Sequence, residues 1–140
     1  MLEKVNLSAA AKQTGELFRY VKIGQLNDHM LTVLQGENRM LDFHTHEQSD
    51  ELFYAIEGRF AIKLDDGMIH LESGDMIIIP KGTRHRPVVT TRMSCLLIEI
   101  DGTLNADNTG GTYRHSLNAS PPSSLPPSLA ESKVCAEATG

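Results

Sequence analysis

The sequence predicts an all-β fold, in which short antiparallel strands form a small barrel or sandwich. Three observations lead to this prediction. Segments of a few β-forming residues follow one another between residues 17 and 103, turn residues separate them, and no helical periodicity runs through the region. Closing such a sheet into a barrel would also remove its exposed strand edges.

A short helix is expected before the barrel, at residues 6–12. Asn6 or Ser8 can act as its N-cap, because their side-chain oxygens can accept hydrogen bonds from free N–H groups of the first turn. Three consecutive alanines favour a helix, and Gly15 ends it. We expect this helix to lie at the periphery of the barrel, as a lid.

The strands are identified by β-forming residues between turns. Phe60, Ile62 and Leu64 alternate with polar or small residues, which indicates a half-buried strand. Asp65, Asp66 and Gly67 then predict a tight hairpin turn. Residues 76–79 are continuously apolar, so they are expected to form a strand that is buried on both faces. The expected strands cover residues 18–23, 30–34, 40–46, 52–56, 60–64, 68–71, 76–79, 83–89 and 93–100.

Composition divides the chain into three parts: a helical segment at residues 1–16, a barrel at residues 17–115 and a tail at residues 116–140. Four of the six prolines lie in the tail among serines, at Pro121, Pro122, Pro126 and Pro127. Such a segment buries too little apolar surface to offset its chain entropy. We therefore expect the tail to be disordered.

The whole composition bounds the function. A chain of 140 residues with 40% hydrophobic residues can bury one modest core. A net charge of -5 and the lack of basic runs argue against nucleic-acid binding. No apolar run approaches the roughly 20 residues that cross a bilayer, and the N-terminus does not resemble a signal peptide, so we expect a cytoplasmic protein without membrane contact. Cys95 and Cys135 are expected to be free thiols.

Four residues form a candidate metal site. His44 and His46 are two residues apart, and on an extended segment such side chains project from the same face. Glu51 adds an oxygen donor and His85 a third nitrogen. A nitrogen and oxygen set without thiolate suits divalent iron, manganese, cobalt, nickel or zinc. The neighbouring carboxylates of Glu47 and Asp50 compete with Glu51 for this role, and a solvated loop position is the alternative for both.

Two spaced motifs in this region resemble those of the cupin superfamily. The first is matched by His44, His46, Glu51 and Gly58. The second is matched by Gly74, Pro80, Gly82 and His85. The chain departs from the family pattern at Asn38, where a glycine is frequent, and at Val89, where the motif ends in asparagine. Neither position supplies a metal ligand.

The resemblance covers residues 17–102 and implies a double-stranded β-helix, or jelly-roll-like barrel, with a divalent metal inside and frequent dimerisation. The family register favours Glu51 over its neighbours as the carboxylate ligand. Residues 102–105 are similar to the exit segment of small single-domain cupins that are often labelled mannose-6-phosphate-isomerase-like. Phe53, Phe60 and Ile62 are expected on the inward face, where they would make the pocket wall largely apolar.

Two functional hypotheses follow. The first is a metal-dependent enzyme, an oxygenase or an isomerase, that acts on a small oxygenated molecule. A sugar-phosphate isomerase needs cationic groups for the phosphate, but Arg84 and Arg86 should point to the face opposite His85. The second hypothesis is a non-catalytic barrel that binds or senses a small molecule, with a structural or ligand-orienting metal. Bound iron with oxygen consumption would favour the first hypothesis, and zinc or nickel without turnover would favour the second.

Overall fold

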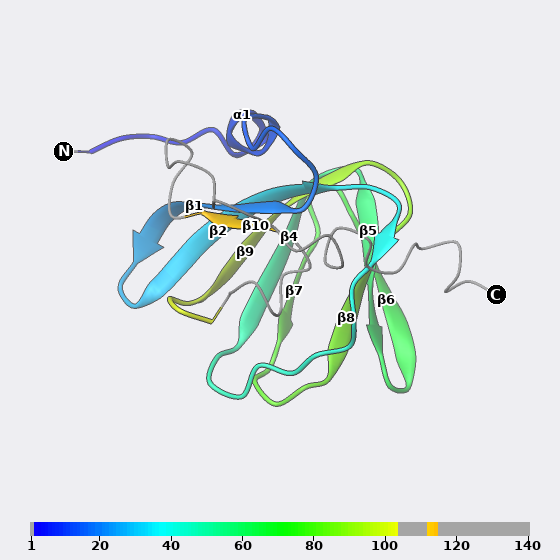
Figure 1. The fold of residues 1–140 in the computed structure, drawn as a ribbon. Coiled ribbons are helices and arrows are strands. Elements are labelled where there is room, and N and C mark those ends of the chain that lie inside the picture. Colours follow the sequence, from blue (N-terminus) through cyan, green and yellow to red (C-terminus); the bar gives the residue numbers. More distant parts are fainter. Residues whose placement is uncertain (1, 104–111, 115–140) are drawn as a thin grey trace.

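The computed structural model describes residues 2–103 and 112–114 of the chain. Two β-sheets pack face to face, and a short helix lies outside them (Figure 1). Almost all strand pairs are antiparallel; β1 (Arg19–Leu26) and β10 (Thr112–Arg114) pair in parallel. The expected all-β barrel with a short N-terminal helix is confirmed.

The remaining elements are α1 (Leu7–Lys12), β2 (His29–Gly36), β3 (Arg39–Met40), β4 (Glu51–Glu57), β5 (Arg59–Leu64), β6 (Gly67–Glu72), β7 (Met76–Ile79), β8 (His85–Val89) and β9 (Met93–Ile100). The larger sheet has the strand order β10-β1-β2-β9-β4-β7, and the smaller sheet has the order β3-β8-β5-β6. Side chains from the facing surfaces of both sheets form the main core, where the rings of Phe53 and Phe60 lie 6.3 Å apart.

Helix α1 forms where the sequence predicts it. The side chain of Asn6 caps it by accepting a hydrogen bond from the Ala9 N–H at 2.9 Å. Ala10 and Ala11 are buried against Val33 and Leu96, on the outer face of the larger sheet. The helix therefore covers that sheet from outside and lies apart from the core between the sheets (Figure 1).

The expected strand at residues 40–46 is wrong. Only Arg39–Met40 pairs with β8, and residues 41–50 form an irregular segment with one isolated bridge, between His44 and His85. The ladder is interrupted because Pro87 has no N–H group to donate. The carbonyl of Leu41 instead accepts a hydrogen bond from Arg86 Nε at 2.8 Å.

Residues 76–79 do form a strand, but the expected burial on both faces is wrong. Met76 is 56% exposed and Ile78 is 51% exposed. Strand β7 lies at the edge of the larger sheet, so only its inward face is covered. Met68 and Ile69 are likewise exposed on β6, the edge strand of the smaller sheet. An apolar run of four residues therefore could not distinguish a buried strand from an edge strand.

Some expectations concern residues that the structure does not describe. The tail at residues 116–140, its boundary with the barrel and Cys135 lie outside the described residues. Cys95 is described, and it is a buried free thiol. No helix within residues 2–103 and 112–114 is long and apolar enough to span a membrane.

Candidate metal centre

The fold brings the four predicted ligand residues together between the sheets. His44 and His46 come from the irregular segment at residues 41–50, Glu51 is the first residue of β4, and His85 is the first residue of β8. One ligand atom from each residue lies within 4.8 Å of all the others. His85 is 34 residues from Glu51 in the sequence but close to it in space, and the group of four could hold a metal ion.

The distances inside the group suit a shared cation. His85 Nε2 lies 2.9 Å from Glu51 Oε1, and His46 Nε2 lies 3.6 Å from the same oxygen. Donors bound to one divalent cation at about 2.1 Å lie about 3 Å apart when they occupy adjacent positions. The ring centroid of His44 lies 4.5 Å from that of His85 and 4.8 Å from that of His46. A cation could therefore contact all four groups with small side-chain adjustments.

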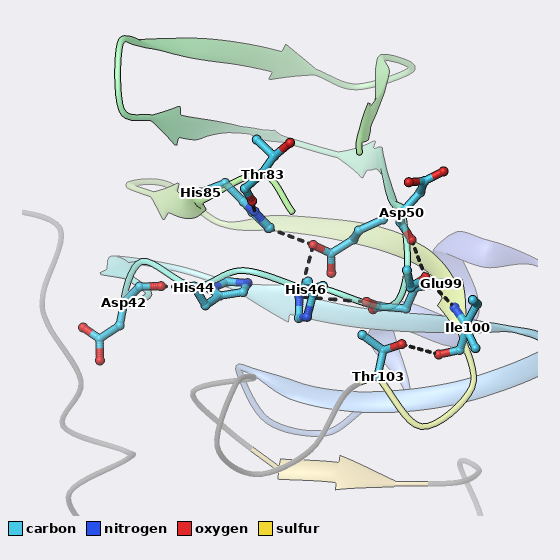
Figure 2. Close-up of polar contacts among 11 residues, drawn as sticks. Asp42, His44, His46, Asp50, Thr83, His85, Glu99, Ile100 and Thr103 are labelled. Atoms are coloured by element: carbon cyan, nitrogen blue, oxygen red, sulfur yellow. Dashed lines mark hydrogen bonds and ion pairs between the residues drawn. The ribbon is translucent and has the colours of Figure 1, made fainter. Parts of the chain in front are cut away.

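Backbone carbonyls orient two of the imidazoles. His44 Nδ1 lies 2.9 Å from the Asp42 carbonyl, and His85 Nδ1 lies 2.8 Å from the Thr83 carbonyl (Figure 2). A carbonyl oxygen can only accept a hydrogen bond, so each Nδ1 carries the proton and each Nε2 keeps a free lone pair. Such an outer contact fixes the tautomer and orientation of metal-binding histidines in general.

The third imidazole contains an unsatisfied atom. His46 Nε2 is buried and has no hydrogen-bond partner among the described residues. Burial lowers the pKa of His46 to about 4, with smaller contributions from the His44 and His85 charges. Burial is also the main cause of the lowered pKa values of His44 and His85. At neutral pH all three imidazoles are therefore neutral, which is the form that binds metals.

Glu51 is almost completely buried, and this burial raises its pKa. Because His85 Nδ1 donates to Thr83, the 2.9 Å contact between His85 Nε2 and Glu51 requires a proton on the carboxyl group. A bound cation would replace that proton and satisfy both lone pairs. The donor set, the fixed tautomers and the unsatisfied nitrogen therefore fit a divalent metal.

Specific hydrogen bonds hold the irregular segment in place. The Gly82 N–H donates to the His46 carbonyl at 2.8 Å, and the Lys81 N–H donates to Asp50 Oδ1 at 2.8 Å. On the other side of the segment, the Ile100 N–H donates to Ser49 Oγ at 2.9 Å. The segment is thus attached both to the turn before β8 and to the end of β9.

An inner cavity and a surface groove both reach the candidate centre. A narrow cavity of about 30 Å³ reaches His44 and Glu51 from the interior. Its wall is mainly apolar and includes Phe18, Leu34, Phe53, Phe60, Met93 and Leu97. A surface groove of about 390 Å³ reaches His46 from outside, between residues 45–48 and 100–103. The expected inward positions of Phe53 and Phe60 agree with this arrangement, whereas Ile62 is buried in the core without lining the cavity.

The carboxylates that compete with Glu51 as ligands, and the arginines on either side of His85, make contacts outside the ligand group. Asp50 binds the Lys81 N–H, while Glu47 is exposed and lines the outer groove. The guanidinium carbons of Arg84 and Arg86 lie 3.9 Å and 4.5 Å from the ring centroid of Phe43. Arg84 also pairs with Asp65, so it is occupied outside the ligand group.

Sequence reasoning missed Glu99. This residue of β9 is completely buried, and its Oε1 atom lies 4.0 Å from His46 Nε2 (Figure 2). Burial, and then the neighbouring Glu51 charge, raise its pKa. A signal was present, because Glu99 has the same strand parity as the inward residues Cys95 and Leu97. An acidic residue on that face of an apolar strand indicates a polar site.

Comparison with known proteins gives matches at the level of sequence and structure. A family model described as the Cupin domain matches residues 29–101. The protein YdbB of Bacillus subtilis is 37% identical over 102 residues, which cover 71% of this chain and 88% of that protein. A solved cupin-2 domain protein from Shewanella frigidimarina superposes with a TM-score of 0.65 at 27% identity, covering 69% of this chain and 93% of that protein.

An enzyme is also among the matches. The 3-hydroxyanthranilate 3,4-dioxygenase of Cupriavidus pinatubonensis is 38% identical over 85 residues. The match covers 56% of this chain and 43% of the dioxygenase, so this chain spans less than half the length of that enzyme.

Proposed function

This chain belongs to the cupin family, and from that premise we propose that His44, His46, Glu51 and His85 hold one divalent cation at which a small oxygenated molecule is converted. The observation that carries the proposal is the convergence of three imidazoles and one carboxylate within 4.8 Å. Three neutral nitrogen donors and one oxygen donor leave further coordination positions for an exchangeable ligand.

We propose oxygenation as the reaction. The similarity to a dioxygenase supports it, and so does the donor set, since histidine and carboxylate ligands without thiolate suit ferrous iron in oxygenases. Iron, when bound, would supply the redox chemistry with dioxygen. The protein would supply fixed geometry: the Asp42 and Thr83 carbonyls would keep the His44 and His85 rings aimed at the cation.

The inner cavity would set the environment of the substrate. Its apolar wall excludes water from the side that His44 and Glu51 face. At about 30 Å³ the cavity admits a few atoms, so an aromatic substrate requires lining side chains to move. Met93 is suited to such a movement, because its unbranched side chain has three rotatable bonds.

Isomerisation of a sugar phosphate has weaker support. A phosphate group needs cationic partners, and Arg84 and Arg86 contact the Phe43 ring, with Arg84 also paired to Asp65. The matches support the cupin family without specific support for the mannose-6-phosphate-isomerase label. We therefore place oxygenation first.

Oxygen uptake tests the proposed reaction. Full-length protein is loaded with Fe²⁺ under anaerobic conditions and then mixed with oxygenated buffer that contains 3-hydroxyanthranilate or a related aminophenol. We expect oxygen consumption in step with loss of the aromatic absorbance. His85→Ala should abolish both, while the exposed Glu72→Gln should leave both unchanged. Absence of uptake by iron-loaded protein across the aminophenols would contradict the oxygenase proposal.

One observation favours a second candidate function. The small volume of the inner cavity is compatible with a barrel that binds a small molecule at a structural or ligand-orienting metal without turnover. Metal analysis of protein purified without chelator or affinity resin separates the two functions. Iron with substrate-dependent oxygen uptake supports the enzyme, whereas zinc or nickel without turnover supports the binding protein.

A further inference from the structure

Glu99 is a buried acidic side chain next to the candidate metal centre. It is completely inaccessible to solvent, and neither of its carboxylate oxygens has a hydrogen-bond partner among the described residues. The register of β4 and β9, in which Leu52 pairs with Ile98, puts Glu51 opposite Glu99 on the inward face. Two acidic side chains therefore lie side by side between the sheets.

The group that Glu99 faces is His46. Glu99 Oε1 lies 4.0 Å from His46 Nε2, which is too long for a direct hydrogen bond. His46 Nε2 is itself buried without a hydrogen-bond partner in the described part of the chain. Two unsatisfied polar atoms thus face each other across a gap beside the proposed cation.

Charge balance explains why a second carboxylate is useful there. A divalent cation with three neutral imidazoles and the Glu51 carboxylate retains one positive charge. An uncompensated charge in an apolar interior is strongly unfavourable. One further carboxylate at the position of Glu99 makes the whole centre neutral.

We propose that Glu99 is the outer carboxylate of the metal centre, where it balances the cation's remaining charge and accepts a hydrogen bond from a water molecule bound to that cation. This proposal rests on the proposed metal site. Glu99 is not one of the four residues whose ligand atoms lie within 4.8 Å of one another. It lies behind them and faces His46. Glu99 is therefore a positioning residue: it would orient a water molecule bound to the cation and would not bind the cation itself.

The backbone around Glu99 is fixed independently of the metal. Glu99 pairs with Met30 of β2, and the next residue, Ile100, donates its N–H to Ser49 Oγ at 2.9 Å. Ser49 lies in the same irregular segment as His46. The backbone positions of Glu99 and His46 are therefore held by contacts that do not involve the Glu99 side chain, so a substitution of that side chain should leave the backbone in place.

The test is Co²⁺ binding by full-length Glu99→Gln, measured by competition with a chelator and by the visible absorption of bound Co²⁺. Outer-contact substitutions typically weaken metal affinity by about 10- to 100-fold, and we expect that loss here. The positions of the Co²⁺ bands should stay close to those of the unsubstituted protein, because the four direct ligands remain. Glu99→Asp, which keeps the charge, should recover part of the affinity.

Ser94→Ala is the matched control. Ser94 lies on the same strand, is buried on the opposite face, and its hydroxyl also has no hydrogen-bond partner among the described residues. We expect unchanged Co²⁺ affinity in this variant. Thermal unfolding without metal completes the test, since Glu99→Gln should be at least as stable as the unsubstituted protein once the unpaired acid is removed.

Three results would overturn the inference. The first is unchanged Co²⁺ affinity in Glu99→Gln. The second is a large shift of the Co²⁺ bands in this variant, which would identify Glu99 as a direct ligand. The third is a lower melting temperature of the metal-free variant, which would identify a structural role. Failure of the metal site itself is distinguishable. In that case the unsubstituted protein would bind no Co²⁺, or His85→Ala would bind it as well as the unsubstituted protein.

Discussion

The candidate centre draws its ligands from two kinds of backbone. Glu51 and His85 begin regular strands, so the ladders of β4 and β8 fix their positions. His44 and His46 lie on the irregular segment at residues 41–50, which has one isolated bridge and otherwise depends on separate hydrogen bonds. Both kinds of backbone deliver ligand atoms to the same small volume.

The comparison shows where the site is robust and where it is vulnerable. Strand β4 pairs with β7 and β9, and strand β8 pairs with β3 and β5, so losing one backbone contact of Glu51 or His85 should have a limited effect. The irregular segment is attached by separate hydrogen bonds, which involve Leu41, His44, His46, Ser49 and Asp50. Substitutions at those attachments should disturb the metal site more than equally destabilising substitutions elsewhere.

The largest effect is expected from removing ligands of either kind. His44→Ala and His85→Ala should each reduce bound metal from about one equivalent to almost none, because each variant removes one of the three imidazole donors that hold the cation. His85→Ala should also lower the free energy of unfolding by about 2 kcal/mol or more, since it leaves a buried cavity beside Glu51. Elemental analysis and denaturant unfolding measure the two effects, and full metal retention by either variant would refute the ligand assignment.

The next effect concerns the attachment of the irregular segment to β9. Ser49→Ala leaves the partly buried Ile100 N–H without its acceptor, which should cost about 1 kcal/mol of stability or more. Metal affinity should fall as well, because His46 is on the same segment. Urea unfolding and chelator competition measure these changes.

Ser94→Ala serves again as the control for Ser49→Ala. It removes a buried hydroxyl that has no partner among the described residues, so the stability loss should be smaller and metal affinity should not change. Equal losses of stability and metal affinity in the two serine variants would contradict a specific role for the hydrogen bond between Ser49 and Ile100.

A smaller effect is expected at the turn that contacts His46. Gly82 has φ +83°, and an alanine there would be strained by about 1–2 kcal/mol even though space is available. Gly74 is a close match, with φ +96° and open space around it, but it lies in a turn away from the ligands. Both alanine variants should lose similar stability, and only Gly82→Ala should weaken Co²⁺ binding. Equal affinities in the two variants would contradict this role of the turn.

The last effect is graded with pH, and it separates the carboxyl groups of Glu51 and Glu99, which lie on strands, from the three histidines. Without metal, burial raises the pKa values of Glu51 and Glu99 above their unfolded values. Between about pH 7 and 9 the unfolded chain has already released these protons while the folded chain retains part of them. The histidines, whose pKa values are lowered from 6.5, are neutral in both states there.

Stability of the metal-free protein should therefore decrease as pH rises through this window, by at most about 1.4 kcal/mol per pH unit for each proton released. Glu51→Gln should flatten the slope, and the exposed Glu72→Gln should not. Denaturant unfolding in a chelating buffer at several pH values measures the slope. A slope of opposite sign would contradict the assigned direction of the carboxyl shifts.

Much of the fold was predictable because its signals are local. Turn residues such as Asn27, Asp65 and Asp66 separate β-forming segments, and the helix cap at Asn6 is determined by its own next residues. Burial of β7 was not predictable, since sheet order decides which strand lies at an edge. The parallel pairing of β10 with β1 joins residues that are 93 positions apart in the sequence, so no local pattern could indicate it.

The sequence predicted which residues form the candidate site, but it did not predict the backbone conformation that carries two of them. Spacing identified His44, His46, Glu51 and His85, and the fold brings them together. The regular strand expected at residues 40–46 does not form, because Pro87 of the opposite strand interrupts the ladder. Glu99 was missed because its motif is a single acidic residue in an apolar strand, and its importance depends on the register of β4 with β9.

The bridge between His44 and His85 has a kinetic consequence. The two residues exchange both backbone hydrogen bonds, at 2.9 Å and 3.0 Å, so their Cα atoms are held together by the chain itself. The protein should therefore remetallate after chelation in a single second-order step whose rate rises linearly with added cation. A plateau in that rate would instead reveal a unimolecular rearrangement that has to precede capture.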